Sequence, residues 1–491
     1  MADTDSSISS LASVGRGAAL FTGGKLASQA FGFLAVAILT NTLGAERYGV
    51  YAFATTIIAL TGSIANLGSD KAILRFLPIK DTQQSTYWSF SVLISLLGGG
   101  AACVLLFTLA PVINTHTINH SLFPTTLRVF TILLLANIAL QMSRSAFRAL
   151  DRPELTTVAH QFVHPGLKVT IFGLLAAVTA SYMTILLGLI AATLIAAALG
   201  IAILLAKTPI KLTWPTEIAV RDYLDFSLPS AIKDVGSLLY TRIDILMLGA
   251  LATASGIGVY QVAIVLGAVV ALPLSGMNQI FPAIASKLYS DGNHAELERV
   301  FSSVTRWTVT VSLPIVIGVV VYRTEILSIM GEDFTDGGIV LSILLLGQFV
   351  NTAVGPSGFL LMMTDHQRLV MLNQWVFGVV NVGLNYVLIT RAGITGAAVA
   401  TTITLISLNI TRLVEISVLE GWFPYTRAFV KPATAALAMT IILFGVKYVF
   451  SGLSGLIAGA IFGGLTFFAV LHLAGVSDTD RLVYKKIRES T

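Results

Sequence analysis

Basic and amide side chains recur at helical spacing inside the apolar stretches of this sequence. Three such stripes lie in the first 180 residues: Lys25 and Gln29; Arg144 and Arg148; and His160, His164 and Lys168. A spacing of four residues puts the members of each stripe on one face of a helix. No acidic residue accompanies them within the predicted spans of this half. Because a buried cation without a counterion is stable only where water or an anion reaches it, we expect these stripes to line a cavity that accepts a phosphate or pyrophosphate.

A later apolar stretch carries charges of both signs. We assign Lys233 and Arg242 to the same cationic cavity. Asp234 and Asp244 are our candidates for ion-coupling residues, because ionisable residues inside membrane spans usually mark substrate or ion pathways. A structural alternative remains open, in which Arg242 and Asp244 simply compensate each other.

The other stripes have structural alternatives as well. Arg144 and Arg148 fall near the predicted cytoplasmic end of a helix, where cations complement the helix dipole and follow the positive-inside rule. His160 and His164 have a spacing that suits two metal ligands, but no third ligand is evident in the sequence. We therefore expect no metal site and no cofactor.

The elements that position these residues follow from the composition. Of the 491 residues, 55% are hydrophobic and 11% are charged, against roughly 25% charged in a soluble domain. Apolar stretches long enough to cross a bilayer core of about 30 Å recur along the whole chain. We predict an all-α polytopic membrane protein with about 14 transmembrane helices. The net charge of +5 without long basic runs gives no support for nucleic-acid binding.

The predicted spans and the basic residues suggest an organisation and an orientation. We expect a disordered cytoplasmic tail at 1–15, an N-terminal lobe of six helices at 16–206, a cytoplasmic linker at 207–227, a C-terminal lobe of six helices at 228–420, two further helices at 421–475 and a second cytoplasmic tail at 476–491. Most of the 30 Lys and Arg residues fall on the side that holds both termini, so this side is expected to be the cytoplasm. We expect the protein to lie in the cell membrane and to act as a monomer.

Two segments about 205 positions apart read alike and indicate an internal repeat. TLGAERYGVY, starting at Thr42, and MLGALATASGIGVY, starting at Met247, each place Leu-Gly at a helix end and Gly-Val-Tyr at the start of the next helix. Transporters are often built from such repeats, with the substrate path between the two halves.

The sequence also resembles a known family. The chain resembles the polysaccharide-biosynthesis, Wzx-like flippases of the multidrug/oligosaccharidyl-lipid/polysaccharide (MOP) superfamily over about residues 15–475. The segments that carry the resemblance are TLGAERYGVY, NLGSDKAILRF, LDFSLPSAIKDV, EILSIMGEDFTDGG and NVGLNYVLITRAGITGAAVAT.

The resemblance implies two pseudo-symmetric six-helix lobes with two extra helices. It implies a transporter, not an enzyme, that moves a lipid-linked oligosaccharide to the outer leaflet by alternating access, for surface polysaccharide or glycoprotein biosynthesis. The family's cationic cavity has matching residue types here in Lys25, Lys168, Lys233 and Arg242. The implied partners are the lipid-linked oligosaccharide, membrane lipids, and glycosyltransferases or a polymerase of the same pathway.

Two alternatives stay open. A drug or cation antiporter of the same superfamily would need an acidic site in the first half and twelve spans. An integral membrane glycosyltransferase or polymerase would need catalytic carboxylates and a sizeable domain at the membrane face, and the short predicted outer loops argue against it.

Overall fold

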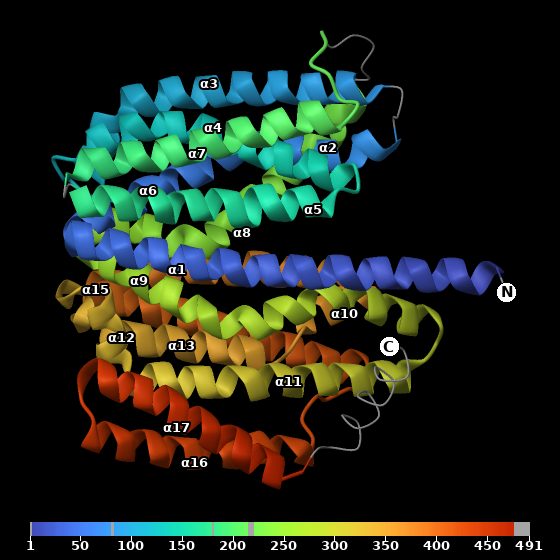
Figure 1. The fold of residues 1–491 in the computed structure, drawn as a ribbon, viewed down its shortest axis with the longest axis vertical. Helices are drawn as coiled ribbons and strands as arrows, with labels where there is room; N and C mark the ends of the chain where they lie inside the picture. The colour runs from blue at the N-terminus through green and yellow to red at the C-terminus, as the bar shows by residue number, and fades with distance from the viewer. Residues whose placement is uncertain (1, 80–82, 179–180, 215–219, 476–491) are drawn as a thin grey trace. The chain divides into compact units, whose positions relative to one another are not determined.

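The chain folds into long helices joined by short turns (Figure 1). The computed structural model describes residues 2–79, 83–178, 181–214 and 220–475, and no strand occurs among them. The described residues divide between two compact units, Met1–Gly258 and Val259–Thr491, which are described here one at a time. Many large apolar side chains on the helices are exposed, as expected where a helix faces lipid rather than water.

The first unit is a bundle of long helices. Its elements are α1 (Ala2–Ala65), α2 (Ser69–Ile79), α3 (Gln84–His116), α4 (Phe123–Ala149), α5 (Pro153–Thr156), the π-helix η2 (Thr157–Val163), α6 (His164–Val178), α7 (Tyr182–Lys207), α8 (Val220–Leu251) and the start of α9 (Ala254–Gly267). Helix α4 packs against α1, α3 and α7, which makes it the central helix of the unit. Figure 1 shows α3, α4 and α7 lying side by side.

The second unit has the same character but more interrupted helices. It continues with η3 (Ala268–Ala271), α10 (Leu272–Ser290), α11 (His294–Val321), α12 (Arg323–Ile329), η4 (Glu332–Gly337), α13 (Gly338–Ala353), α14 (Ser357–Met363), α15 (Gln367–Leu419), η5 (Arg427–Phe429), α16 (Val430–Val449) and α17 (Gly452–Leu473). Helices α16 and α17 form a hairpin that packs on α11.

Eleven helical segments among the described residues are long and apolar enough to cross a bilayer. Two of them contain a break: α1 at Gly44, with φ of 71°, and α15 at Ala392–Gly393, where Gly393 has φ of 55°. Glycine takes these left-handed conformations without steric penalty. The expected all-α polytopic architecture is confirmed. One detail is wrong: α1 begins at Ala2, so the opening segment is helical rather than disordered.

A close crossing of two backbones joins the two repeated segments. A Cβ atom built on Gly49 would overlap the carbonyl oxygen of Ala254, and one built on Gly258 would overlap the carbonyl oxygen of Ala45. Each segment therefore carries an Ala-x-x-x-Gly pattern, and each glycine receives the alanine carbonyl of the other segment. Small residues at this spacing let helices approach closely within a membrane.

Candidate functional site

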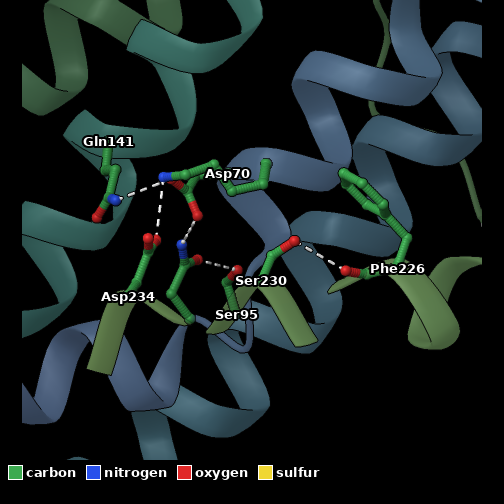
Figure 2. Close-up of polar contacts among 8 residues, drawn as sticks. Asp70, Ser95, Gln141, Phe226, Ser230 and Asp234 are labelled. Carbon is green, nitrogen blue, oxygen red and sulfur yellow. Dashed lines mark hydrogen bonds and ion pairs between the residues drawn. The ribbon is translucent and has the colours of Figure 1, made fainter. Parts of the chain in front are cut away.

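A buried carboxylate lies at the centre of a polar network in the first unit. Asp70 has only 4% of its surface exposed. Its Oδ1 accepts a hydrogen bond from the Asn66 side chain at 3.0 Å, and its Oδ2 accepts one from Gln141 at 3.0 Å and one from Lys71 at 2.6 Å. Figure 2 shows Gln141 reaching Asp70 from the neighbouring helix α4. The network thus satisfies both oxygens of a carboxylate that is closed off from solvent.

The network continues from α2 to α3 and α8. The Lys71 ammonium lies 3.1 Å from Asp234 of α8, so one lysine bridges two carboxylates. The Ser95 hydroxyl donates to Asn66 at 2.8 Å (Figure 2). Burial lowers the pKa of Lys71, but the hydrogen bonds and charges of Asp70 and Asp234 outweigh this effect and raise the pKa above its ordinary value of 10.5. Lys71 therefore stays charged at neutral pH.

The turn before α2 explains why these groups meet. Leu67 and Gly68 both have positive φ, at 49° and 71°, and reverse the chain between α1 and α2. Gly68 also lies so close to the Ser227 carbonyl of α8 that a side chain there would overlap it. Helix α2 starts at the next residue, Ser69, with Asp70 in its first turn, where a negative charge is favourable to the helix dipole.

A cavity of about 390 Å³ adjoins this network within the first unit. It is lined by Ile58, Ala59, Gly62, Ser63, Asn137, Ile138, Gln141 and Asp234. Two side-chain amides, a carboxylate and a hydroxyl therefore face the same space as several apolar groups. Such a mixture suits a sugar, whose hydroxyls accept and donate hydrogen bonds while its ring carbons pack on apolar atoms.

The face of α4 that carries this cavity continues into the expected basic stripe. Asn137, Gln141, Arg144 and Arg148 follow at intervals of four, three and four residues, over about 16 Å of helix. Arg144 and Arg148 are both exposed at their side chains. Amides and guanidinium groups thus follow one another along a single helix face.

The histidine stripe crosses the junction of a π-helix and an α-helix, because His160 lies in η2 whereas His164 and Lys168 lie in α6. The backbone N–H of His164 bonds to the Ala159 carbonyl, five residues back. Pro165 has no N–H to donate to the carbonyl four residues before it, which accounts for a change of helical pitch here. The π-helix ends at Val163, two residues before this proline. Such segments occur frequently at functional sites.

The members of this stripe differ in their surroundings. His160 is buried, packs its ring 6.2 Å from that of Phe147 and lies 3.4 Å from the Ser143 hydroxyl. His164 has a buried Nε2 with no hydrogen-bond partner among the described residues. Lys168 is half-buried and forms no ion pair with any residue of the described ranges. Arg144 lies close enough to both histidines to act on them electrostatically.

The remaining candidates are scattered or fall outside the described side chains. Gln29 and Arg242 are exposed. Asp244 is buried and accepts a hydrogen bond from the backbone N–H of Ile245 at 2.8 Å. The side chains of Lys25 and Lys233 lie outside the described residues. No group of three potential metal-ligating side chains occurs in the part of the chain that the structure describes.

Sequence reasoning missed the centre of the polar network. Neither Asp70 nor Lys71 is among the candidates named from the sequence, which predicted no acid beside the basic residues within the spans of the first half. Asp70 is in fact buried against α4, where Gln141 meets it. A signal was available in NLGSDKAILRF, one of the segments that carry the family resemblance, because it holds adjacent opposite charges directly after a Leu-Gly turn.

Comparison with known proteins agrees with the resemblance. A family model described as polysaccharide biosynthesis protein matches residues 14–287, more than half of the chain, and a model described as MatE matches residues 229–387. A protein of Haloferax volcanii called probable low-salt glycan biosynthesis flippase Agl15 is 26% identical over 472 residues, which are 93% of either chain. The teichuronic acid biosynthesis protein TuaB of Bacillus subtilis is 24% identical over 235 residues, 46% of this chain and 48% of its own.

Solved structures share the fold at low sequence identity. The lipid II flippase MurJ in an inward closed conformation has a TM-score of 0.74 and 14% identity, over 92% of this chain and 97% of its own. An inward-facing multidrug resistance MATE transporter of the MOP superfamily has a TM-score of 0.63 and 14% identity, over 80% and 94%. The chain is therefore a multi-pass membrane protein that belongs to the polysaccharide biosynthesis protein family.

Proposed function

We propose that this protein moves a lipid-linked oligosaccharide, carried on a polyisoprenyl phosphate or pyrophosphate, from the cytoplasmic to the outer leaflet by alternating access. The family and the flippase name of the Haloferax relative support this substrate class. The transport problem is physical: each unpaired hydroxyl or amide costs several kcal/mol in hydrocarbon, so a sugar chain does not cross a bilayer unaided. A polar path through the protein removes that cost.

The observation that carries the proposal is the continuous polar face of α4. Toward the N-terminus of this face, Asn137 and Gln141 line the 390 Å³ cavity. Toward its C-terminus, the face carries Arg144 and Arg148, beside the histidine stripe. In our proposal the sugar occupies the cavity. The phosphate lies against the basic groups, where Lys168 has no acid partner among the described residues. Lys25, Lys233 and Arg242 would add to this positive field during transport.

The proposed architecture has about 14 spans. Dividing α1 at Gly44 and α15 at Gly393, and counting α8 as a span despite its charges, brings the number of crossing segments to this value. Residues 16–206 and 228–420 then form two lobes joined by the 207–227 linker, followed by two spans within 421–475. We place the protein in the cell membrane. Most Lys and Arg residues fall on the side of the membrane that holds both termini, so we place that side in the cytoplasm.

Reconstitution into liposomes tests the function. The full chain is incorporated with a fluorescent polyprenyl-pyrophosphate-linked sugar, and an impermeant quencher reports how fast the outer leaflet gains the label. We expect Lys168→Gln to slow flipping about tenfold, because one charge-assisted contact is worth about 1.5–3 kcal/mol. Lys207→Gln, at the end of α7, is the matched control and is expected to leave the rate unchanged. Equal rates in both variants and the wild type would remove the cationic site from the mechanism.

A cation or drug antiporter of the same superfamily is the second candidate. The buried carboxylate of Asp70 and the nearby Asp234 favour it, because such antiporters need an acidic site in the first half. The MatE match over residues 229–387 also agrees with it. Ethidium efflux driven by an imposed proton or sodium gradient distinguishes the two: we expect no efflux by this protein, and efflux lost in Asp70→Asn would favour the antiporter.

A further inference from the structure

A second cavity, of about 520 Å³, lies within the second unit between α11 and the α16–α17 hairpin. It is lined by Arg306, Trp307, Thr310, Ala428, Lys431, Pro432, Phe468, Leu471, His472 and Gly475. None of these residues belongs to the cavity beside Asp70, and none of the described residues that line the space is acidic. This cavity is therefore a separate feature with its own chemistry.

Three basic side chains reach this cavity from three helices. Arg306 comes from the middle of α11 and is buried, Lys431 comes from the first turn of α16, and His472 is the next-to-last residue of α17. Lys431 donates one hydrogen bond to the Gly475 carbonyl at 2.8 Å, and an ammonium has two further protons to donate. The three groups thus meet at one end of the α16–α17 hairpin. We place this end at the cytoplasmic surface, because most Lys and Arg residues are expected on that side.

The other half of the lining is apolar, and one of its side chains is exposed on the outer surface of α17. Trp307, Pro432 and Leu471 line the cavity, and Phe468 has 67% of its surface exposed. Neighbouring side chains on α17 are exposed in the same way, with Leu465 at 64%. Because an exposed apolar helix face of a membrane protein contacts acyl chains, the cavity is open toward lipid. Tryptophan is also enriched at the depth of the lipid headgroups.

We propose that this cavity binds the phosphate of an anionic lipid, taken from the membrane, with the basic side chains on the phosphate and the aromatic and aliphatic side chains on the first carbons of the lipid. Basic pockets between transmembrane helices at the cytoplasmic side suit such headgroups. A guanidinium carries five N–H donors in a planar arrangement that suits phosphate oxygens even where some of them bond elsewhere, and the lysine adds a point charge. The site would attach the α16–α17 hairpin to α11 through a lipid that both contact.

Phosphate chemistry is shared by lipid headgroups and by free phosphate in water, and the apolar half of the lining favours the lipid. A cavity for free phosphate has no need of the Trp307 and Phe468 rings. The simplest competing explanation is that the three basic groups only follow the positive-inside rule and bind no specific ligand. The experiment below separates these three outcomes.

Native mass spectrometry of the full-length, delipidated protein in detergent tests the proposal directly. Phosphatidylglycerol is titrated in, and the number and affinity of retained lipids are measured. We expect wild-type protein to retain one lipid about tenfold more tightly than Arg306→Gln or Lys431→Gln, because each variant loses one charge-assisted contact. Arg306→Lys keeps the charge and should bind with intermediate affinity. Arg299→Gln, an exposed arginine on the same helix, is the matched control and should bind like the wild type.

Two further arms identify the ligand. Inorganic phosphate at millimolar concentration should displace the retained lipid weakly or not at all. Zwitterionic phosphatidylcholine, which has no net charge, should bind without any difference between the wild type and the variants. Displacement by inorganic phosphate would overturn the lipid assignment in favour of a free anion. Equal retention in wild type, Arg306→Gln and Arg299→Gln would overturn the site altogether. Lys431→Gln, at a position that is only half-buried, keeps the test decisive if the buried arginine variant fails to fold.

Discussion

Replacement of Asp70 by asparagine is the most direct test of the polar network in the first unit. The substitution keeps the shape of the side chain but removes its charge and one of its two acceptor oxygens. Gln141 and Lys71 both donate to Oδ2, at 3.0 and 2.6 Å, so at least one donor would then face an amide NH₂ group. A buried donor without an acceptor is destabilising by about 1–3 kcal/mol.

The size of the effect follows from the exposure of the two charged partners. Breaking a fully buried ion pair by removing one partner costs about 3–5 kcal/mol. The Asp70 side chain is 5% exposed, but that of Lys71 is 39% exposed and keeps Asp234 at 3.1 Å. Solvent and the second carboxylate reduce the cost, so we expect Asp70→Asn to lower the free energy of unfolding by about 2–4 kcal/mol.

Asp225→Asn is the matched control for this experiment. Asp225 pairs with Arg221 on α8 at 3.7 Å, and both side chains are largely exposed, at 71% and 91%. An exposed pair at this spacing contributes less than about 0.5 kcal/mol. Reversible unfolding in mixed lipid–dodecylsulfate micelles, followed by circular dichroism, measures both variants. A loss in Asp70→Asn no larger than that in Asp225→Asn would refute the network as a source of stability.

Three other predictions follow from contacts described above. Gly49→Ala should reduce the yield of folded protein in size-exclusion chromatography at least several-fold, because the new Cβ meets a backbone carbonyl, while Gly32→Ala, with open space around it, should not. The pKa of Lys71 is raised above 10.5, so its contribution to stability is fully present below pH 10.5 and is lost as the pH rises through the pKa of the folded state. The difference in melting temperature between the wild type and Lys71→Gln should therefore be constant from pH 7 to about pH 9 and should shrink above pH 10.5. Lys447→Gln should lower the melting temperature and increase protease cleavage near α16, because Lys447 bonds to Glu325 at 2.8 Å; no change in cleavage would argue against this anchor.

The helical architecture could be predicted from the sequence because it depends on properties that are local in the chain. Segments of low charge and spanning length predict helices in a bilayer, and glycine predicts where they break. Gly44 and Gly393 are both such breaks, and both have positive φ. The two segments that share the Leu-Gly and Gly-Val-Tyr pattern meet at Gly49 and Gly258, a contact that the repeat did not predict.

The centre of the candidate site could not be predicted, because it depends on contacts between residues distant in the sequence. Asp70 and Gln141 are 71 positions apart, and hydropathy assigned the first to a loop and the second to a span. The π-helix before Pro165 was also missed, because proline predicts a disturbance of the helix but not its form. The stripe was drawn at α-helical spacing throughout, whereas His160 lies in the π-helix η2 and His164 begins the α-helix α6.

The glycine crossing limits how its two segments can move. At Gly49 and Gly258 the nearest atoms of the other segment belong to the main chain, so no change of side-chain rotamer moves them apart at these two positions. Tyr48 and Val50 flank Gly49 and are 2% and 0% exposed, so a shift of one residue in either direction would drive a bulky side chain into the place that only a hydrogen atom now fills. The two segments can separate, but they cannot slide past each other in small steps, so this crossing has one defined register.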